Sequence, residues 1–151
     1  MQIDLPTLKL GLIVFWALWL SLVFLSNSLD GLKALGLLPQ RWRFSSKNYG
    51  AVVKATSIYS APEWLAGLLF LGVTAWQGLS GALFWRAFGS SLKSGVLGRP
   101  EVSTAFAISL GLWAAMILAD EIFRTYDLAR THLLIFVAQV VSLLAMYLLP
   151  R

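Results

Sequence analysis

Four long apolar stretches limit the fold of this chain more than any other feature. They cover residues 10–25, 64–84, 102–119 and 133–149 and make up about half of the sequence. An unsatisfied backbone amide costs several kcal/mol in hydrocarbon, so runs of about 17 to 25 apolar residues are typical of membrane-spanning helices. The sequence therefore predicts an all-α membrane protein with four transmembrane helices in an antiparallel bundle.

Composition supports a single membrane domain that takes up the whole chain, residues 1–151. Hydrophobic residues make up 58% of the sequence and charged residues only 13%, which is outside the range of soluble domains. A secretory signal is the alternative interpretation of the first run, but its apolar core is longer than a typical signal core. We expect spans at about 8–27, 63–85, 102–120 and 132–149, with an interfacial connector at 28–60.

Basic residues favour one orientation in the membrane. Four spans place both termini and the second connector on one side. That connector, residues 86–99, carries three basic residues and no acid. The two sides carry nearly equal numbers of basic residues, but the third connector has three acids against two arginines. Since loops with an excess of lysine and arginine stay in the cytoplasm, we expect a multi-pass protein of the bacterial inner membrane with both termini cytoplasmic.

The long first connector has an amphipathic and aromatic character. Its leucines from Leu29 onward predict a short amphipathic helix that ends at Gly36 and Pro39, and residues 48–59 predict a second short helix. Three interpretations stay open for the segment between them: an anchor at the headgroup level, a docking surface for another subunit, or a substrate-binding lid. Basic and aromatic side chains alternate there, at Arg41, Trp42, Arg43 and Phe44.

Polar and small residues inside the spans indicate helix packing. Gln77 and Gln139 are the deepest strongly polar side chains, and each is expected to form a hydrogen bond to another helix. Small residues spaced four apart allow two helix backbones to approach closely. Such pairs are Gly78 with Ala82 and Gly111 with Ala115.

The densest group of polar side chains follows the third span. If the helix continues there, Arg124 follows Asp120 by four residues and Glu121 by three, so its guanidinium can pair with both carboxylates. The simplest interpretation is a solvated ionic cap, and the functional one is a proton, cation or headgroup site at the membrane rim. The candidate rim residues are Asn27, Asp30, Asp120, Glu121, Arg124, Asp127 and the only histidine, His132.

Residue counts exclude several kinds of chemistry. With no cysteine and one histidine, the chain cannot supply a bis-histidine haem, a cysteine zinc site or a cysteine–histidine nucleophile pair. We expect no cofactor and no resident metal. We attribute the net charge of +5 to contact with lipid headgroups, because no basic stripe with interleaved aromatics indicates nucleic acid.

The chain also resembles bacterial families of predicted small four-span integral membrane proteins of unassigned function. The resemblance implies the fold and the membrane but no activity. Four-span glutathione-linked eicosanoid synthases match in size, but arginine and other polar side chains are nearly absent from these spans. The residues that carry the resemblance are Asn27 and Asp30, Trp76-Gln77, Trp85-Arg86, and Asp120-Glu121.

The functional expectation is a small accessory subunit, not an enzyme, that contacts lipids and other membrane subunits or a second copy of itself. The first alternative is an oligomeric protein that handles protons or small solutes through the acidic rim. The second alternative is a lipid-modifying enzyme with a lateral opening lined by Arg41, Arg43 or Arg124.

Overall fold

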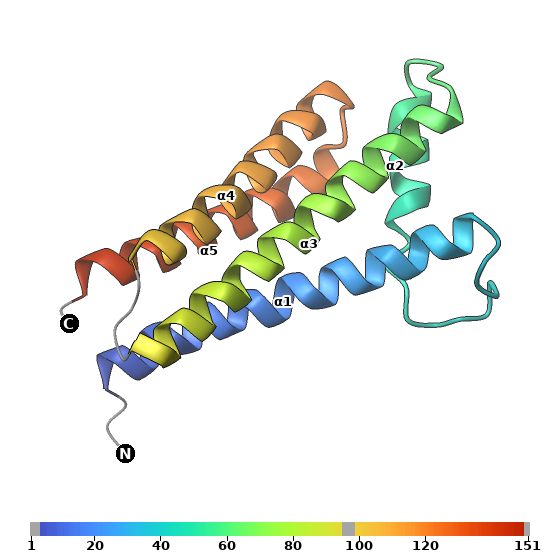
Figure 1. Cartoon of the computed structure of the whole chain (residues 1–151). Coiled ribbons are helices and arrows are strands. Elements are labelled where there is room, and N and C mark those ends of the chain that lie inside the picture. Colours follow the sequence, from blue (N-terminus) through green and yellow to red (C-terminus); the bar gives the residue numbers. More distant parts are fainter. Residues whose placement is uncertain (1–3, 95–98, 150–151) are drawn as a thin grey trace.

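The computed structural model describes residues 4–94 and 99–149, and it confirms the predicted fold class. Four long apolar helices pack antiparallel, and a short helix lies in the first connector (Figure 1). The chain is a multi-pass membrane protein. The helices are α1 (Leu5–Ala34), α2 (Asn48–Ser57), α3 (Glu63–Ser94), α4 (Arg99–Ile122) and α5 (Tyr126–Leu148).

The four long helices pack mainly in chain order. α1 lies against α3, α3 against α4, and α4 against α5, while α2 lies on α3 and α1 at one end of the bundle. Both described ends of the chain lie at the opposite end (Figure 1). The first and third connectors, which flank α2 and link α4 to α5, therefore share one rim, as the count of spans predicted.

The first helix is longer than the sequence predicted. We expected the first span to end near Asn27 and a separate amphipathic helix to follow, but α1 continues to Ala34. Asn27 and Asp30 are buried, Asn27 donates to the Gln77 side chain and Asp30 accepts from the Tyr49 backbone N–H, so they do not mark an exit into water. Gly36 follows the end of the helix, and its φ of 73° allows a Schellman-type turn.

Hydrogen bonds and ring contacts hold the bundle together where the spans meet. Gln77 of α3 accepts a bond from Asn27 at 2.7 Å, and Gln139 of α5 donates to Ser109 of α4 at 2.7 Å. Both glutamines are buried. In an apolar medium such bonds favour one register of neighbouring helices, as we expected for these two residues.

Small residues allow close approach at some of the predicted positions. The ring of Phe24 packs over Gly78, and the ring of Trp76 packs over Gly111. Ala115 is half-buried, but Ala82 is exposed. The second small residue of α3 that packs closely on α1 is Gly81, where an added Cβ would lie 3.5 Å from Leu20. A spacing of three residues, not four, faces α1 here.

Replacing Gly78 by alanine tests the packing of α1 on α3. The new Cβ would lie 2.9 Å from the Phe24 ring, so the ring must move. Overpacking of this kind costs about 1 to 3 kcal/mol. We expect Gly78→Ala to unfold at a lower temperature in detergent than Gly72→Ala, whose Cβ would meet nothing within 4 Å. Equal melting temperatures, measured by circular dichroism, would contradict this packing.

Candidate functional site

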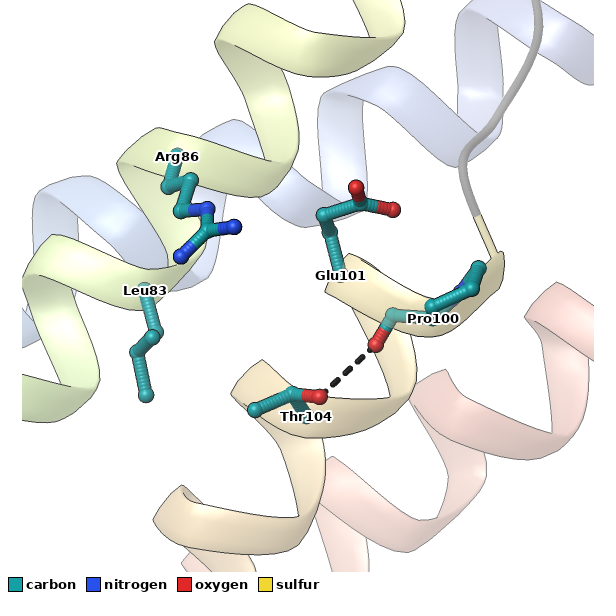
Figure 2. Close-up of a pocket in the computed structure, with 5 residues that line it drawn as sticks. All are labelled: Leu83, Arg86, Pro100, Glu101 and Thr104. Atoms are coloured by element: carbon teal, nitrogen blue, oxygen red, sulfur yellow. Dashed lines mark hydrogen bonds between the residues drawn. The ribbon is translucent and has the colours of Figure 1, made fainter.

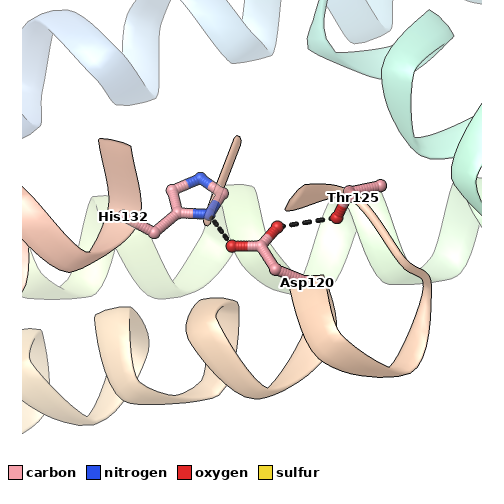
Figure 3. A network of polar contacts seen from close by, with 3 residues as sticks. All are labelled: Asp120, Thr125 and His132. Atoms are coloured by element: carbon pink, nitrogen blue, oxygen red, sulfur yellow. Dashed lines mark hydrogen bonds and ion pairs between the residues drawn. The ribbon is translucent and has the colours of Figure 1, made fainter. Parts of the chain in front are cut away.

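A contact between a carboxylate and an imidazole joins the two helices of the α4–α5 hairpin. His132 Nδ1 lies 2.6 Å from Asp120 Oδ2, and Thr125 Oγ1 donates to Asp120 Oδ1 at 2.8 Å (Figure 3). Asp120 is buried, and the His132 side chain is 12% exposed. Each oxygen of this buried carboxylate therefore has a partner.

The local backbone places these three side chains together. α4 ends at Ile122, and the Thr125 N–H bonds the carbonyl of Asp120 at 2.9 Å. Arg124 turns the chain with a φ of 54°, so the helical spacing assumed from the sequence stops before it. The turn carries Thr125 back toward Asp120, and His132 reaches the same carboxylate from the second turn of α5.

The hydrogen bond determines what His132 can offer to a ligand. When the carboxylate accepts this hydrogen bond, Nδ1 carries the hydrogen, and in the neutral form of the ring Nε2 is then an acceptor. Figure 3 shows Nε2 pointing away from Asp120, toward the side of the bundle on which α1 lies. The pair therefore presents one hydrogen-bond acceptor from a fixed ring.

Aromatic rings connect His132 to α1. The rings of Trp113 and His132 have centroids 5.8 Å apart, and those of Trp19 and Trp113 are 5.5 Å apart. Trp113 is buried, and its Nε1 has no acceptor within the described part of the chain. Sequence reasoning missed this row of rings, because it joins three different helices whose register a single sequence does not define.

The other charged residues of the third connector do not join this pair. Glu121 accepts a hydrogen bond from the Tyr126 hydroxyl at 3.4 Å on the exposed surface. Arg124 and Asp127 are exposed, and no ion pair within the described residues includes either of them. The predicted pairing of Arg124 with Asp120 and Glu121 is wrong, because the helix ends before Arg124.

Asn27 and Asp30 form a separate network at the same rim. Asn48 Nδ2 donates to Asn27 Oδ1 at 2.9 Å, and the Tyr49 backbone N–H donates to Asp30 Oδ2 at 2.8 Å. The carboxylate lies at the N-terminus of α2, where it supplies the capping group that Lys47 lacks. This network fixes α2 on α1, and no hydrogen bond among the described residues links it to Asp120.

A tyrosine joins the two connectors near these networks. The Tyr59 hydroxyl donates to the carbonyl of Ile122 at 2.6 Å, and its ring lies 6.1 Å from that of Phe123. The end of the first connector is therefore fixed to the end of α4, close in sequence to Asp120.

Residues 41–44 form an exposed segment of the first connector, which we call the basic aromatic loop. Lys33 Nζ donates to the Trp42 carbonyl and to Ser45 Oγ, the latter at 3.0 Å. The Gln40 side chain donates to the Lys33 carbonyl at 3.2 Å. The hydrogen bonds thus fix the backbone, while all four side chains, Arg41, Trp42, Arg43 and Phe44, are exposed.

Two hollows lie on the surface of the bundle. One, at the rim near the termini, has a volume of about 380 Å³ and is lined by Leu83, Arg86, Pro100, Glu101 and Thr104 (Figure 2). Thr104 bonds to the Pro100 carbonyl there, and Glu101 stands across from Arg86. The carboxylate makes this hollow unsuited to an anion.

The larger hollow is a groove between α1 and α5, with a volume of about 770 Å³ including its open part. The sequence did not predict this groove, because it depends on how α1 and α5, at the two ends of the chain, pack together. It is lined by Leu12, Phe15, Trp16, Trp19, Thr131, Leu134, Ile135, Ala138 and Ser142.

Neither a metal-binding group nor a similarity to known proteins assigns a function to these sites. The described residues contain no group of three histidine, aspartate or glutamate side chains that could hold a metal ion. Comparison with known families, curated proteins and solved structures finds no match for the chain. Function must therefore be argued from the residues themselves.

Asp120→Asn tests whether the buried pair holds the hairpin together. Hydrogen bonds to charged groups contribute about 1.5 to 3 kcal/mol, and Asp120 has two partners. We expect this variant to be destabilised by that order of magnitude. The matched change Asp127→Asn, at an exposed position, should alter stability by less than about 0.5 kcal/mol. Unfolding in detergent measures both, and equal effects would refute the structural role of the pair.

Tyr49 gives a second test, at high pH. Burial of its phenol, the charge of Glu63 and a hydrogen bond from the phenol to Glu63 raise the pKa of Tyr49 above its ordinary value of 10.0. Because the folded pKa is the higher one, this contribution to stability is present below pH 10 and lost as pH rises above it. Glu63→Gln should lower the pKa of Tyr49 but not to the ordinary value, because burial remains.

Absorbance at the phenolate band, as the difference between the protein and Tyr49→Phe, measures this titration. A Tyr49 that titrates at its ordinary value in the folded protein would show that the phenol does not lie against Glu63.

Proposed function

We propose that this chain is a small accessory subunit of a protein complex in a bacterial inner membrane, and that it binds its partner through the basic aromatic loop. Both termini lie in the cytoplasm in this proposal, so the loop lies on the opposite side. The bacterial location rests on the resemblance of the residue layout to small bacterial membrane proteins.

The observation that carries the proposal is a fixed loop with exposed anchoring side chains. Trp42 and Phe44 are each 48% exposed, although the Trp42 carbonyl accepts a hydrogen bond from Lys33 of α1. Aromatic and arginine side chains are enriched in the energetic centres of protein interfaces. A backbone that is ordered before binding also reduces the entropy lost on association.

The side chains of the basic aromatic loop indicate the kind of partner surface that it binds. Arg41 and Arg43 match carboxylates, which guanidinium groups bind in a bidentate manner. Trp42 and Phe44 match an apolar surface beside those acids. We therefore infer a partner with an acidic, partly apolar segment at the membrane surface, supplied by another membrane subunit.

A binding role is favoured over catalysis by the arrangement at Asp120. Thr125, the hydroxyl nearest this pair, bonds to the carboxylate and not to the imidazole. A hydroxyl nucleophile is activated when it bonds to the base itself. The buried pair accordingly suits a structural latch better than a catalytic site or the mouth of a proton path.

Charge reversal within the loop tests the proposal. The double variant Arg41→Glu with Arg43→Glu should lose the proteins that copurify with the chain in mild detergent. Lys47→Glu with Lys54→Glu makes the same change in charge at exposed positions of the same connector and should retain them. Quantitative mass spectrometry of the purified complexes measures both.

A photoreactive amino acid at position 44 provides a second test of the same proposal. In native membranes it should capture a specific protein. Capture of lipid alone at position 44, or equal loss of partners in both charge-reversed variants, would show that the loop only anchors the protein at the headgroups.

A further inference from the structure

The groove between α1 and α5 is closed at one end and open at the other. Lys9 Nζ donates to the Leu149 carbonyl at 2.9 Å, and Trp16 Nε1 donates to Ser142 Oγ at 3.0 Å. Toward the rim that holds α2, no hydrogen bond among the described residues joins α1 to α5, and the groove lies between the two helices. The two helices therefore form a wedge that opens toward the rim with the Asp120–His132 pair.

The length of the wedge matches one leaflet of a bilayer. Thr131 and Ser142 are both on α5, and at 1.5 Å per residue they lie about 16 Å apart along the helix axis. Half of a hydrocarbon core of about 30 Å is about 15 Å. Ser142 lies near the middle of the apolar run 133–149, so the closed end lies near the bilayer centre.

The closed end limits what can occupy the groove. A transmembrane helix of a partner or of a second copy is about 10 Å wide and must cross the whole bilayer. The bond from Trp16 to Ser142 blocks such a helix at the bilayer centre. A lipid chain is thinner than a helix and enters from a single leaflet, so it fits a wedge of this depth.

The open end supplies polar groups at the level of a lipid's headgroup region. Thr131 lines the groove, and the next residue, His132, has no hydrogen-bond partner at Nε2 among the described residues. Trp113, whose ring lies against His132, has an Nε1 without an acceptor in the described chain. Trp19 lines the groove and contacts the Trp113 ring, so the groove and the pair are adjacent.

We propose that the groove between α1 and α5 binds a hydroxyl-bearing membrane lipid, with one chain against Trp16, Leu134 and Ala138 and the hydroxyl donating to His132 Nε2. Chain and hydroxyl then have the orientation of a lipid in its own leaflet. Asp120 acts as a positioning residue, because its carboxylate holds the imidazole with Nε2 free. The site is independent of the basic aromatic loop, so either proposal can fail alone.

Two photoreactive lipids test the proposal. Diacylglycerol and phosphatidylcholine, each with the same diazirine-bearing and alkyne-tagged acyl chain, are added at trace level to phosphatidylcholine vesicles that contain the protein. The first has a free hydroxyl and the second has none. We expect diacylglycerol to label the protein about three- to tenfold more, which is the range of one hydrogen bond. The labelled peptides should come from α1 and α5 at the groove.

Two substitutions by phenylalanine provide the matched control. Ala138 lines the groove and is exposed, so Ala138→Phe fills the site without entering the core. Ala82 is exposed on α3, away from the groove. Labelling by diacylglycerol should fall about tenfold in Ala138→Phe and stay unchanged in Ala82→Phe. His132→Gln should remove the preference for diacylglycerol while the chain still labels.

Several results would overturn the proposal. Equal labelling by the two lipids in the unmodified protein would refute recognition of the hydroxyl. Labelling that survives Ala138→Phe, or maps to Leu71 and Leu118 on other faces, would identify ordinary surrounding lipid. A photoreactive residue at position 134 that captures a protein or a second copy in native membranes would assign the groove to a polypeptide. Unfolding curves of each variant show that loss of labelling does not come from loss of the fold.

Discussion

The structure depends on the need to satisfy every polar group inside the bilayer. Water is absent from the hydrocarbon core, so a backbone or side-chain polar group there must find its partner within the protein. The four long helices meet this need for the backbone. Most of the buried polar side chains meet it by bonding to a neighbouring helix, as Asn27 does with Gln77, Ser109 with Gln139 and Trp16 with Ser142.

These bonds also define the shape that matters for function. The bond from Trp16 to Ser142 joins α1 to α5, whereas most of the contacts of α1 are with α3. Asp120 also stabilises the α4–α5 turn and fixes the His132 ring beside the open end of the groove. The packing of the helices therefore leaves a lateral groove between α1 and α5, and a hydrogen-bond acceptor lies at the open end of this groove.

The fold was predictable from the sequence, and much of the site was not. Apolar length and the absence of charge suffice for counting spans, because the bilayer allows few other structures. The end of α1 was not predictable from Asn27 and Asp30, since their side chains find partners on α2 and α3 that lie far away in the sequence. Of seven predicted rim residues, Asp120 and His132 are in contact, and Asn27 and Asp30 belong to another network. The row formed by Trp19, Trp113 and His132 depends on the register of three helices, which no local pattern encodes.

The lipid site requires α1 and α5 to diverge toward the rim. Distance measurement between spin labels on the two helices tests this divergence directly. The chain contains no cysteine, so pairs of labels can be placed at chosen sites. Labels at Leu25 and Leu133, at the open end, should lie clearly farther apart than labels at Leu8 and Leu148, at the closed end. Equal distances for the two pairs in lipid vesicles would show that the helices run side by side, and would contradict both the wedge and the lipid site in it.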